Sequence, residues 1–269
     1  MVSELTADLS GPDETVFSHQ TLTRADILAL DRLAAAAWMA PEREEHAGWV
    51  FRFAEGVSRR ANSVAPFPLQ NGTHFEDALA CAEAFYRARG LPPRVQISSA
   101  AEPDGLDNLL DARGYKIESG VTIMIADALS LANGEQPANA EVYPNAPDGW
   151  WDAYIEAYSR DARSVVAEAR DEALFAQITG DDGGIEALGL GVIGGRWLGV
   201  FGMYTRPACR RRGLAQKIIG ALARFAVDRG AIGVYLQVED DNPAARTLYE
   251  KLGFRAVYGY HYRTLWNQP

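Results

Sequence analysis

The sequence predicts an α/β protein made of two related halves. Its 269 residues, 48% of them hydrophobic, suffice for one large domain or two domains of ordinary size. Apolar runs that read as strands alternate with amphipathic helical segments, most regularly between residues 197 and 254. The second observation is a weak internal repeat, in which residues 90–115 align over residues 230–254 with a single gap. A repeat of this size indicates that one fold has been duplicated.

Charge and composition argue against several kinds of function. The formal net charge is −10, which argues against a nucleic-acid partner although arginines cluster locally. No apolar run reaches the length of a membrane span and the first residues are acidic, so we expect no membrane partner and a cytoplasmic location. Cys81 and Cys209 are far apart and the four histidines are scattered, so no metal site is expected.

The first half is expected to alternate helices and strands after a frayed tail. Thr23 is a candidate N-cap for the first helix, with Asp26 at the capping-box position. Aromatic residues alternate in the first strand, and a Glu55-Gly56 turn would connect it to the second strand in a hairpin. The expected elements are a tail at 1–18, helices at 23–39, 73–89 and 104–113, and strands at 46–54, 57–65, 94–98 and 115–125.

The second half is expected to follow a linker at 127–145, which contains an Asn-Gly pair and a proline. A Gly194-Gly195 turn precedes the central strand, and Pro207 ends that strand because proline cannot donate to a sheet. The expected helices are 150–160, 164–178, 213–230 and 242–253, and the expected strands are 187–193, the run from 196, 232–238, 255–258 and 260–265.

The segment 199–229 reads as a strand, a basic turn and a helix, and it predicts an anion site. The first N–H groups of a helix have no partner within the helix, and they lie at the positive end of its dipole. Gly213 lets a phosphate approach the backbone closely, and the arginines at 210–212 add positive charge. Taken alone, three consecutive arginines are also compatible with a solvated surface.

Two motifs in this half carry a resemblance to a known family. Arg210-Arg211-Arg212-Gly213-Leu214-Ala215 opens a helix, and a strand later the chain reads NPAARTLYEKLGF from Asn242 to Phe254. In this order and spacing they resemble the GNAT superfamily of acetyl-CoA-dependent N-acetyltransferases, with the match spanning about residues 184–265. The resemblance implies two GNAT-like folds in tandem, each a mainly antiparallel mixed sheet with helices on both faces.

The resemblance also assigns different roles to the two halves. Residues 1–130 would form a degenerate N-terminal copy and residues 138–269 the catalytic domain. The first copy has Gln70-Asn71-Gly72-Thr73 in place of the arginine turn, and Leu110 stands where the second copy has Tyr249. We therefore expect the first copy not to bind acetyl-CoA in the family manner.

Acetyl-CoA is the expected cosubstrate, and no metal is expected. By resemblance, the basic turn holds the pyrophosphate, the end of the central strand pairs with the pantetheine amides, and Asn242 contacts the cofactor arm. Asn242 also fits a helix N-cap, and the two roles are compatible. The expected cofactor-binding residues are Met203, Tyr204, Thr205, Arg210, Arg211, Arg212, Gly213, Leu214, Ala215, Gln216, Asn242 and Ala245.

Proton transfer is expected to involve Tyr249 and an acid. Tyr249 matches the tyrosine that often protonates the leaving thiolate in this family, although a packed aromatic residue is the plainer interpretation. The central strand lacks the glutamate that some members use as a base, so Glu239 and Asp240 are the nearest acids in sequence. A turn role for these acids, or deprotonation through water, remains open.

The acceptor is expected to be a primary amine, most simply of a small molecule, with a protein N-terminus or lysine as alternatives. Arg60 and Asn62, in the polar run 59–63, are candidate acceptor-binding residues, and a solvated edge strand is the alternative. A non-catalytic acyl-CoA sensor or scaffold is the second functional hypothesis. A nucleotide-binding loop is the third, and it lacks the usual Lys-Ser/Thr ending. The sequence is compatible with a homodimer.

Overall fold

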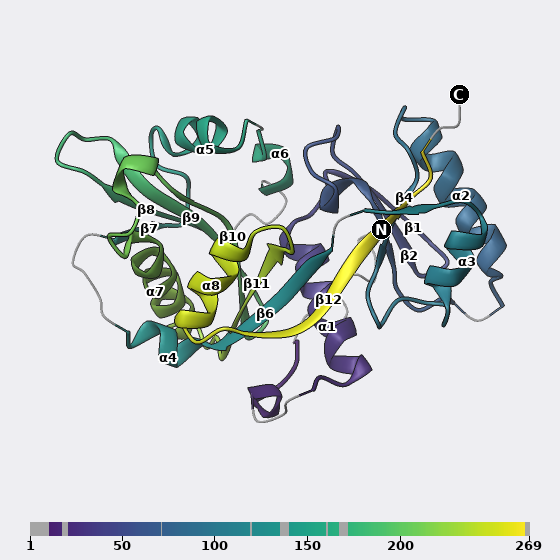
Figure 1. Cartoon of the computed structure of the whole chain (residues 1–269), viewed down its shortest axis with the longest axis horizontal. Helices are drawn as coiled ribbons and strands as arrows, with labels where there is room; N and C mark the ends of the chain where they lie inside the picture. Colours follow the sequence, from purple (N-terminus) through teal and green to yellow (C-terminus); the bar gives the residue numbers. More distant parts are fainter. Residues whose placement is uncertain are drawn as a thin grey trace.

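A computed structural model describes residues 11–17, 21–70, 72–118, 120–134, 140–159, 161–166 and 172–266. Within these ranges, twelve strands form one mixed sheet in the order β1-β2-β3-β4-β12-β6-β11-β10-β9-β8-β7, and β5 pairs with β12. Among the described strand pairs only β3 with β4 and β10 with β11 are parallel. The expected mixed, mainly antiparallel α/β fold is confirmed (Figure 1).

The two halves have the same strand order. In the first, β1, β2 and β3 are antiparallel neighbours and β3 is parallel to β4. In the second, β8, β9 and β10 are antiparallel neighbours and β10 is parallel to β11. The bounds in the first half are α1 (Arg24–Ala37), β1 (Glu42–His46), β2 (Trp49–Phe53), β3 (Val64–Pro66), α2 (Phe75–Arg87), β4 (Arg94–Ile97), α3 (Leu106–Ala112), β5 (Lys116–Ile117) and β6 (Val121–Asp127).

The halves exchange their last strands. β6 pairs with β11 of the second half, and β12 pairs with β4 of the first. β6 and β12 also pair with each other and run side by side through the middle of the molecule (Figure 1). One continuous sheet therefore extends across the boundary between the two expected domains, which lies between residues 130 and 138. The remaining bounds are α4 (Ala128–Ala132), β7 (Ala140–Tyr143), α5 (Trp150–Tyr158), α6 (Arg163–Val166), β8 (Ala173–Thr179), β9 (Ile185–Gly194), β10 (Trp197–Thr205), α7 (Leu214–Val227), β11 (Gly233–Glu239), α8 (Pro243–Lys251) and β12 (Arg255–Thr264).

Several locally encoded elements form as predicted. Thr23 caps α1 in a complete capping box with Asp26. Asn242 caps α8 by accepting a hydrogen bond from the Ala245 N–H, at 3.1 Å. α7 begins after Gly213, whose φ of +73° favours glycine.

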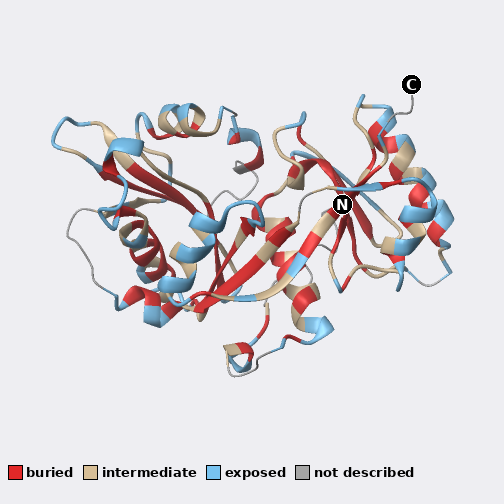
Figure 2. Ribbon diagram, in the orientation of Figure 1, coloured by how far each residue is buried: buried red, intermediate tan, exposed pale blue. Residues whose placement is uncertain are grey.

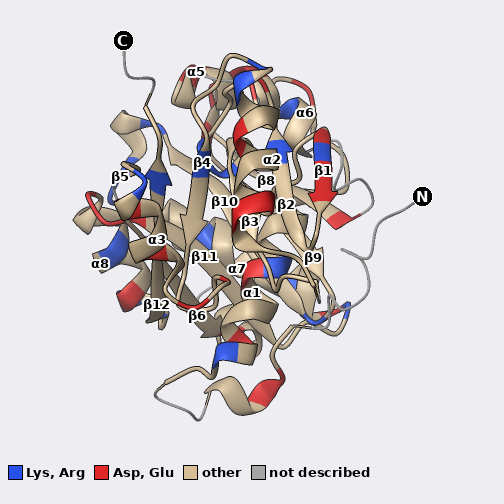
Figure 3. Ribbon diagram, turned by 90° about the vertical axis from the view of Figure 1, so that its right-hand side faces the viewer, with Lys and Arg blue, Asp and Glu red and all other residues tan. Residues whose placement is uncertain are grey.

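The predicted tight hairpin of 46–54 with 57–65 is wrong in its turn, although β2 does pair antiparallel with β3 at the end of the second segment. β2 forms its hairpin with β1, and the segment after Glu55-Gly56 is a loop with a 3₁₀ turn at Arg60–Asn62. The Asn62 side chain stabilises this loop by accepting from the N–H groups of Ala54 and Gly56. β1 went unpredicted because its sequence EREEH is almost entirely charged, which suits an exposed edge strand (Figure 3).

Three further expectations are corrected. Residues 173–178, expected in a helix, belong to β8 (Ala173–Thr179), which is buried between β7 and β9. Residues 167–171 of that predicted helix lie outside the described ranges. The predicted linker 127–145 contains α4, which is capped by Asp127, and β7. Residues 11–17 of the predicted tail pack on the protein, since Trp197 Nε1 donates to the Pro12 carbonyl at 2.7 Å. The rest of that tail, residues 1–10 and 18, lies outside the described ranges.

Helices cover both faces of the second half's sheet. Ile218 and Leu222 of α7 pack in one apolar core with Leu198 of β10. Residues of α1 and α5 share the other core with Leu188 and Leu190 of β9. The strands between these layers are largely buried, whereas the outer sides of the helices are exposed (Figure 2). None of the helices in the described ranges is both long and apolar enough to cross a membrane.

Candidate active site

The site begins where β10 separates from β11. Their parallel pairing runs from Trp197 with Gly233 to Val200 with Leu236, although both strands continue further. On its other side, β10 has an irregular register with β9 between Phe201 and Tyr204, where Gly202 has a φ of +54°. The backbone of β10 beyond Val200 is therefore not paired with β11.

α5 holds this irregular part of β10 in place. The Tyr158 hydroxyl donates to the Met203 carbonyl at 2.8 Å. A Cβ atom at Gly202 would lie only 2.8 Å from a ring carbon of Tyr154. Glycine is thus required at position 202 both for its backbone angle and for the close approach of Tyr154.

A cavity of about 580 Å³ lies in the opening between the strands. Residues of both halves line it, from the loop after β2, from α5, from β10 and β11, from α8 and from β12. Six predicted site residues share this wall: Arg60, Met203, Glu239, Asn242, Ala245 and Tyr249. The remaining predicted residues, Tyr204, Thr205, Arg210, Arg211, Arg212, Gly213, Leu214, Ala215, Gln216 and Asn62, do not line it.

The basic turn at 210–213 lies on the surface before α7. Arg210 donates to the Thr205 carbonyl, and Arg212 forms an ion pair with Glu186 at 2.9 Å. Arg211 is exposed with a φ of +62°. The first helical hydrogen bond of α7 runs from the Lys217 N–H to the Gly213 carbonyl, so the preceding N–H groups have no acceptor within the helix. This turn can therefore bind an anion that approaches α7 from its N-terminus.

Tyr249 lies on α8 and lines the cavity. Its ring packs edge-on against Phe254, with ring centroids 5.8 Å apart. Burial raises the pKa of Tyr249 to about 12, so the hydroxyl keeps its proton at neutral pH. Asn242, two helical turns earlier, uses Oδ1 for the cap and leaves its amide nitrogen to donate elsewhere.

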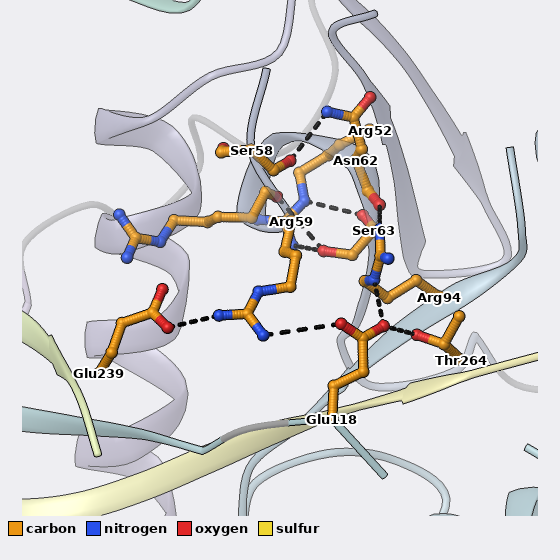
Figure 4. Close-up of polar contacts among 10 residues, drawn as sticks. Arg52, Ser58, Arg59, Asn62, Ser63, Arg94, Glu118, Glu239 and Thr264 are labelled. Carbon is orange, nitrogen blue, oxygen red and sulfur yellow. Dashed lines mark hydrogen bonds and ion pairs between the residues drawn. The ribbon is translucent and has the colours of Figure 1, made fainter. Parts of the chain in front are cut away.

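Glu239, at the end of β11, is the only acidic residue on the described cavity wall. Arg59 from the first half binds it, with Nη2 and Oε2 2.5 Å apart, and also lies 3.6 Å from Glu118 (Figure 4). Although burial opposes its charge, hydrogen bonds from Thr264 and Arg94 hold the pKa of Glu118 below its usual range. This ion-pair network joins β11 and β12 of the second half to the first half. Asp240, the other acid considered, accepts a hydrogen bond from Thr122 instead.

The two candidate acceptor-binding residues occupy different positions. Arg60 faces the cavity, where its guanidinium carbon lies 5.8 Å from the centre of the Phe201 ring. Asn62 is fully engaged within its loop, because it also donates to the Ser58 carbonyl (Figure 4). Neither residue lies on an edge strand, so the alternative of a solvated edge strand is wrong.

Sequence reasoning missed the aromatic side of the cavity. Tyr260 and Tyr262 of β12 and Tyr154 and Tyr158 of α5 line it, together with Gln237 of β11. The alternation of tyrosines at 258, 260 and 262 would have placed them on one strand face. Their position in the cavity follows only from the strand exchange, which no local pattern encodes.

The first half has no comparable opening in its described part. The equivalent place, between the ends of β3 and β4, contains a cavity of only about 10 Å³. The Glu102 N–H donates to the Pro66 carbonyl at 3.1 Å, and Trp49 Nε1 donates to the Glu102 carbonyl. The chain after β4 therefore closes the gap that stays open between β10 and β11.

Metal ligation has no support in the described ranges, where no three His, Cys, Asp or Glu side chains form a group that could hold an ion. The two cysteines are free, and Cys209 is buried.

Comparison with known proteins defines the family. Residues 24–263 match a family model described as "Probable histone acetyltransferase Rv0428c C-terminal". The chain is 30% identical to the "Uncharacterized N-acetyltransferase YobR" of Bacillus subtilis, over 88% of this chain and 98% of that protein. It is 28% identical to the "Probable histone acetyltransferase Rv0428c" of Mycobacterium tuberculosis, over 89% of this chain and 74% of that one.

Solved structures agree on the fold. A GCN5-related N-acetyltransferase from Kribbella flavida superposes with a TM-score of 0.66 and 18% identity, covering 88% of this chain and 96% of that one. A tandem GNAT protein from the clavulanic acid biosynthesis pathway superposes with a TM-score of 0.63 and 13% identity, covering 98% and 93%. The chain belongs to the GNAT N-acetyltransferases, in the family of the Rv0428c C-terminal region.

Proposed function

We propose that this protein transfers the acetyl group of acetyl-CoA to a primary amine of a small molecule, at a single site in its second half. The observation that carries this proposal is the opening between β10 and β11, which leads into a cavity with Tyr249 and Asn242 on its wall. Membership in an acetyltransferase family and the surface position of the basic turn support it.

Two parts of the protein would share the binding of acetyl-CoA. The exposed N-terminus of α7 and the arginines at 210–212 would hold the phosphates, as the dipole and free N–H groups favour. The unpaired edge of β10 beyond Val200 would pair with the pantetheine amides. Acetyl-CoA supplies a thioester, and a β10 N–H group near Met203 would polarise its carbonyl.

Two cavity residues would handle protons. Tyr249, protonated at neutral pH, would donate to the departing sulfur. Glu239 would accept the proton of the amine through water, since it is the only carboxylate on the described wall. The ion pair with Arg59 fixes the position of the Glu239 carboxylate. Arg59 also competes with the incoming proton for the negative charge of that carboxylate.

The acceptor proposal rests on how the cavity is enclosed. The loop containing Arg59 and Arg60 and the tyrosines of β12 form part of the cavity wall, together with the opened strands. Trp38, directly after α1, fixes this loop by donating to the Ser58 hydroxyl at 3.1 Å. A small amine fits such a closed site better than a folded protein does. A lysine of a protein is the second candidate, favoured by the Mycobacterium tuberculosis relative, which is named a probable histone acetyltransferase.

An acetyl-CoA-dependent screen tests this function. The protein is incubated with acetyl-CoA and either small amines or lysine-containing peptides, and free thiol release is measured. We expect thiol release that depends on both protein and small amine, with the acetylated amine found by mass spectrometry. Binding of acetyl-CoA without thiol release from any acceptor would support the sensor or scaffold alternative, and release with peptides alone would support the protein acceptor.

A further inference from the structure

Two buried hydrogen-bond donors on the cavity wall have no acceptor. Within the described residues, Arg60 Nε and Gln237 Nε2 are inaccessible to solvent and make no hydrogen bond. The Gln237 carbonyl oxygen is already used, because Tyr260 donates to it at 2.7 Å. A buried donor without a partner costs free energy, so two of them in one cavity indicate that a bound molecule supplies the acceptor atoms.

Arg60 differs from the other arginines around the cavity in its charge balance. Arg59 is bound to Glu118 and Glu239, and Arg94 is bound to Glu118 at 2.9 Å. Arg60 has no carboxylate within ion-pair distance in the described part of the chain. Among the arginines described around this cavity, Arg60 is therefore the one whose positive charge is not balanced by a carboxylate.

Arg52 adds to this positive charge from behind the wall. It is buried, and its donors go to neutral oxygens of Ser63 and Gln96. Within the described ranges, the acid that interacts electrostatically with Arg52 is the buried Asp31. Burial raises the pKa of the Asp31 carboxyl to about 6. Arg60 itself receives no such compensation.

The neighbours of Arg60 are neutral tyrosines. Burial opposes the charge of Arg60, and a side-chain hydrogen bond with Tyr260 supports it. Burial also raises the pKa of Tyr235 and Tyr262, so these hydroxyls carry no charge at neutral pH. Arg60 is therefore a cation whose described neighbours are hydroxyl oxygens and π-electrons, because the Glu239 carboxylate on the same wall is bound by Arg59.

We propose that the acceptor amine carries a carboxylate, and that Arg60 and Gln237 bind this carboxylate inside the cavity. This inference rests on the proposed acetyl-transfer function and narrows its substrate class to amino acids and related amino carboxylic acids. A guanidinium is suited to a carboxylate because its N–H groups match the two oxygens. The two unpartnered donors supply hydrogen bonds to the same group.

The position of Arg60 fits a short distance between the carboxylate and the reacting amine. Its guanidinium lies over Phe201, which directly precedes the irregular stretch of β10 where the strands open. A carboxylate bound there leaves the amine, a few bonds away, beside the place proposed for the thioester. The positive charge of Arg60 also excludes polyamines and other acceptors that carry only positively charged groups, because Arg60 would repel those groups.

The test uses matched sets of acceptors. Glycine, β-alanine, 4-aminobutyrate and phenylalanine are each compared with their carboxamide and with the amine that lacks the carboxyl group. Thiol release from acetyl-CoA gives kcat/KM for every compound. For the wild-type protein we expect kcat/KM to be highest for the carboxylate of at least one set, by roughly 10²-fold over its amide and amine.

Three variants separate recognition of the acceptor from general damage. Arg60→Gln should lower kcat/KM for the preferred carboxylate by roughly 10²-fold and leave the carboxyl-free amine nearly unchanged. Gln237→Glu places a carboxylate on the same cavity wall as Arg60 and should remove the preference in the same way. Arg87→Gln, which removes an exposed charge at the end of α2, should change nothing. Thermal unfolding and acetyl-CoA affinity are measured for each variant to confirm that folding and cofactor binding are intact.

The outcomes distinguish this inference from the proposed function. Equal kcat/KM for carboxylate, amide and amine would overturn the inference while leaving acetyl transfer established. A loss of acetyl-CoA affinity in Arg60→Gln would also overturn it, since Arg60 would then belong to the cofactor site. If no compound is acetylated, the proposed function fails, and calorimetry with CoA and the N-acetyl derivatives decides the carboxylate site. Binding of N-acetylated amino acids that Arg60→Gln abolishes would support the site, and absence of any such binding would reject it.

Discussion

Tyr249→Phe is expected to lower kcat by roughly 10²–10⁴-fold while acetyl-CoA affinity stays nearly unchanged. The variant keeps the ring and its packing on Phe254 and removes only the hydroxyl. Because burial raises the pKa of Tyr249 to about 12, the tyrosine remains protonated throughout the working range. The group that donates to the leaving sulfur should therefore not limit kcat at any pH between 7 and 10.

Tyr143→Phe is the matched control, since Tyr143 lies on the edge strand β7 and does not line the cavity. Pre-steady-state thiol release should be compared for the two variants, so that chemistry rather than product release is measured. Turnover of Tyr249→Phe at the wild-type rate would mean that the tyrosine only packs, and that water protonates the thiolate.

Gly213→Glu is expected to weaken acetyl-CoA binding by on the order of 10²-fold or more. Gly213 has a φ of +73° directly before α7, where the helix dipole favours phosphate. A Cβ atom there meets nothing within 4 Å, so the protein itself has room for the side chain. The loss of affinity should come from placing a carboxylate beside the phosphates, together with a modest backbone cost.

Gly230→Glu provides the control at the other end of α7. Gly230 also has a positive φ, of +87°, and a Cβ atom there also meets nothing within 4 Å. Both variants therefore carry the same backbone strain and the same added charge, and they differ in their distance from the proposed phosphate site. Calorimetric affinities that fall equally in both would remove the basic turn from the site.

Local sequence patterns predicted those parts of the fold that neighbouring residues determine, above all the helix ends. The capping box of Thr23, the glycine before α7 and the Asn242 cap each specify one helix end from neighbouring residues. These same features led to the cofactor-binding hypothesis, because the basic turn and the Asn242 cap are local motifs. Their placement on the described surface and cavity wall agrees with that hypothesis and leaves it to be tested.

Predictions failed where the cause lies elsewhere in the chain. The run that forms β8, ALFAQIT, has no strand alternation because both of its faces are buried, and it therefore resembles a helix. The charged β1 is a strand only because β2 pairs with it. In both cases tertiary contacts override the local preference.

The acceptor side of the site shows the same limit. The polar run 59–63 makes Arg60 a candidate acceptor-binding residue, but its uncompensated charge depends on Arg59 binding Glu239 and Glu118. The tyrosines of β12 reach the cavity because β12 crosses from β6 to β4 in the joined sheet. No neighbouring residue in the sequence carries that information.

The most direct test of a single catalytic half is a calorimetric titration of the full chain with acetyl-CoA. The opening between β10 and β11 predicts one site per chain, since the equivalent gap between β3 and β4 holds only about 10 Å³. Saturation at one acetyl-CoA per chain, with affinity lost in Gly213→Glu, is the predicted result. Saturation at two equivalent sites, or a single site whose affinity Gly213→Glu leaves unchanged, would contradict the account.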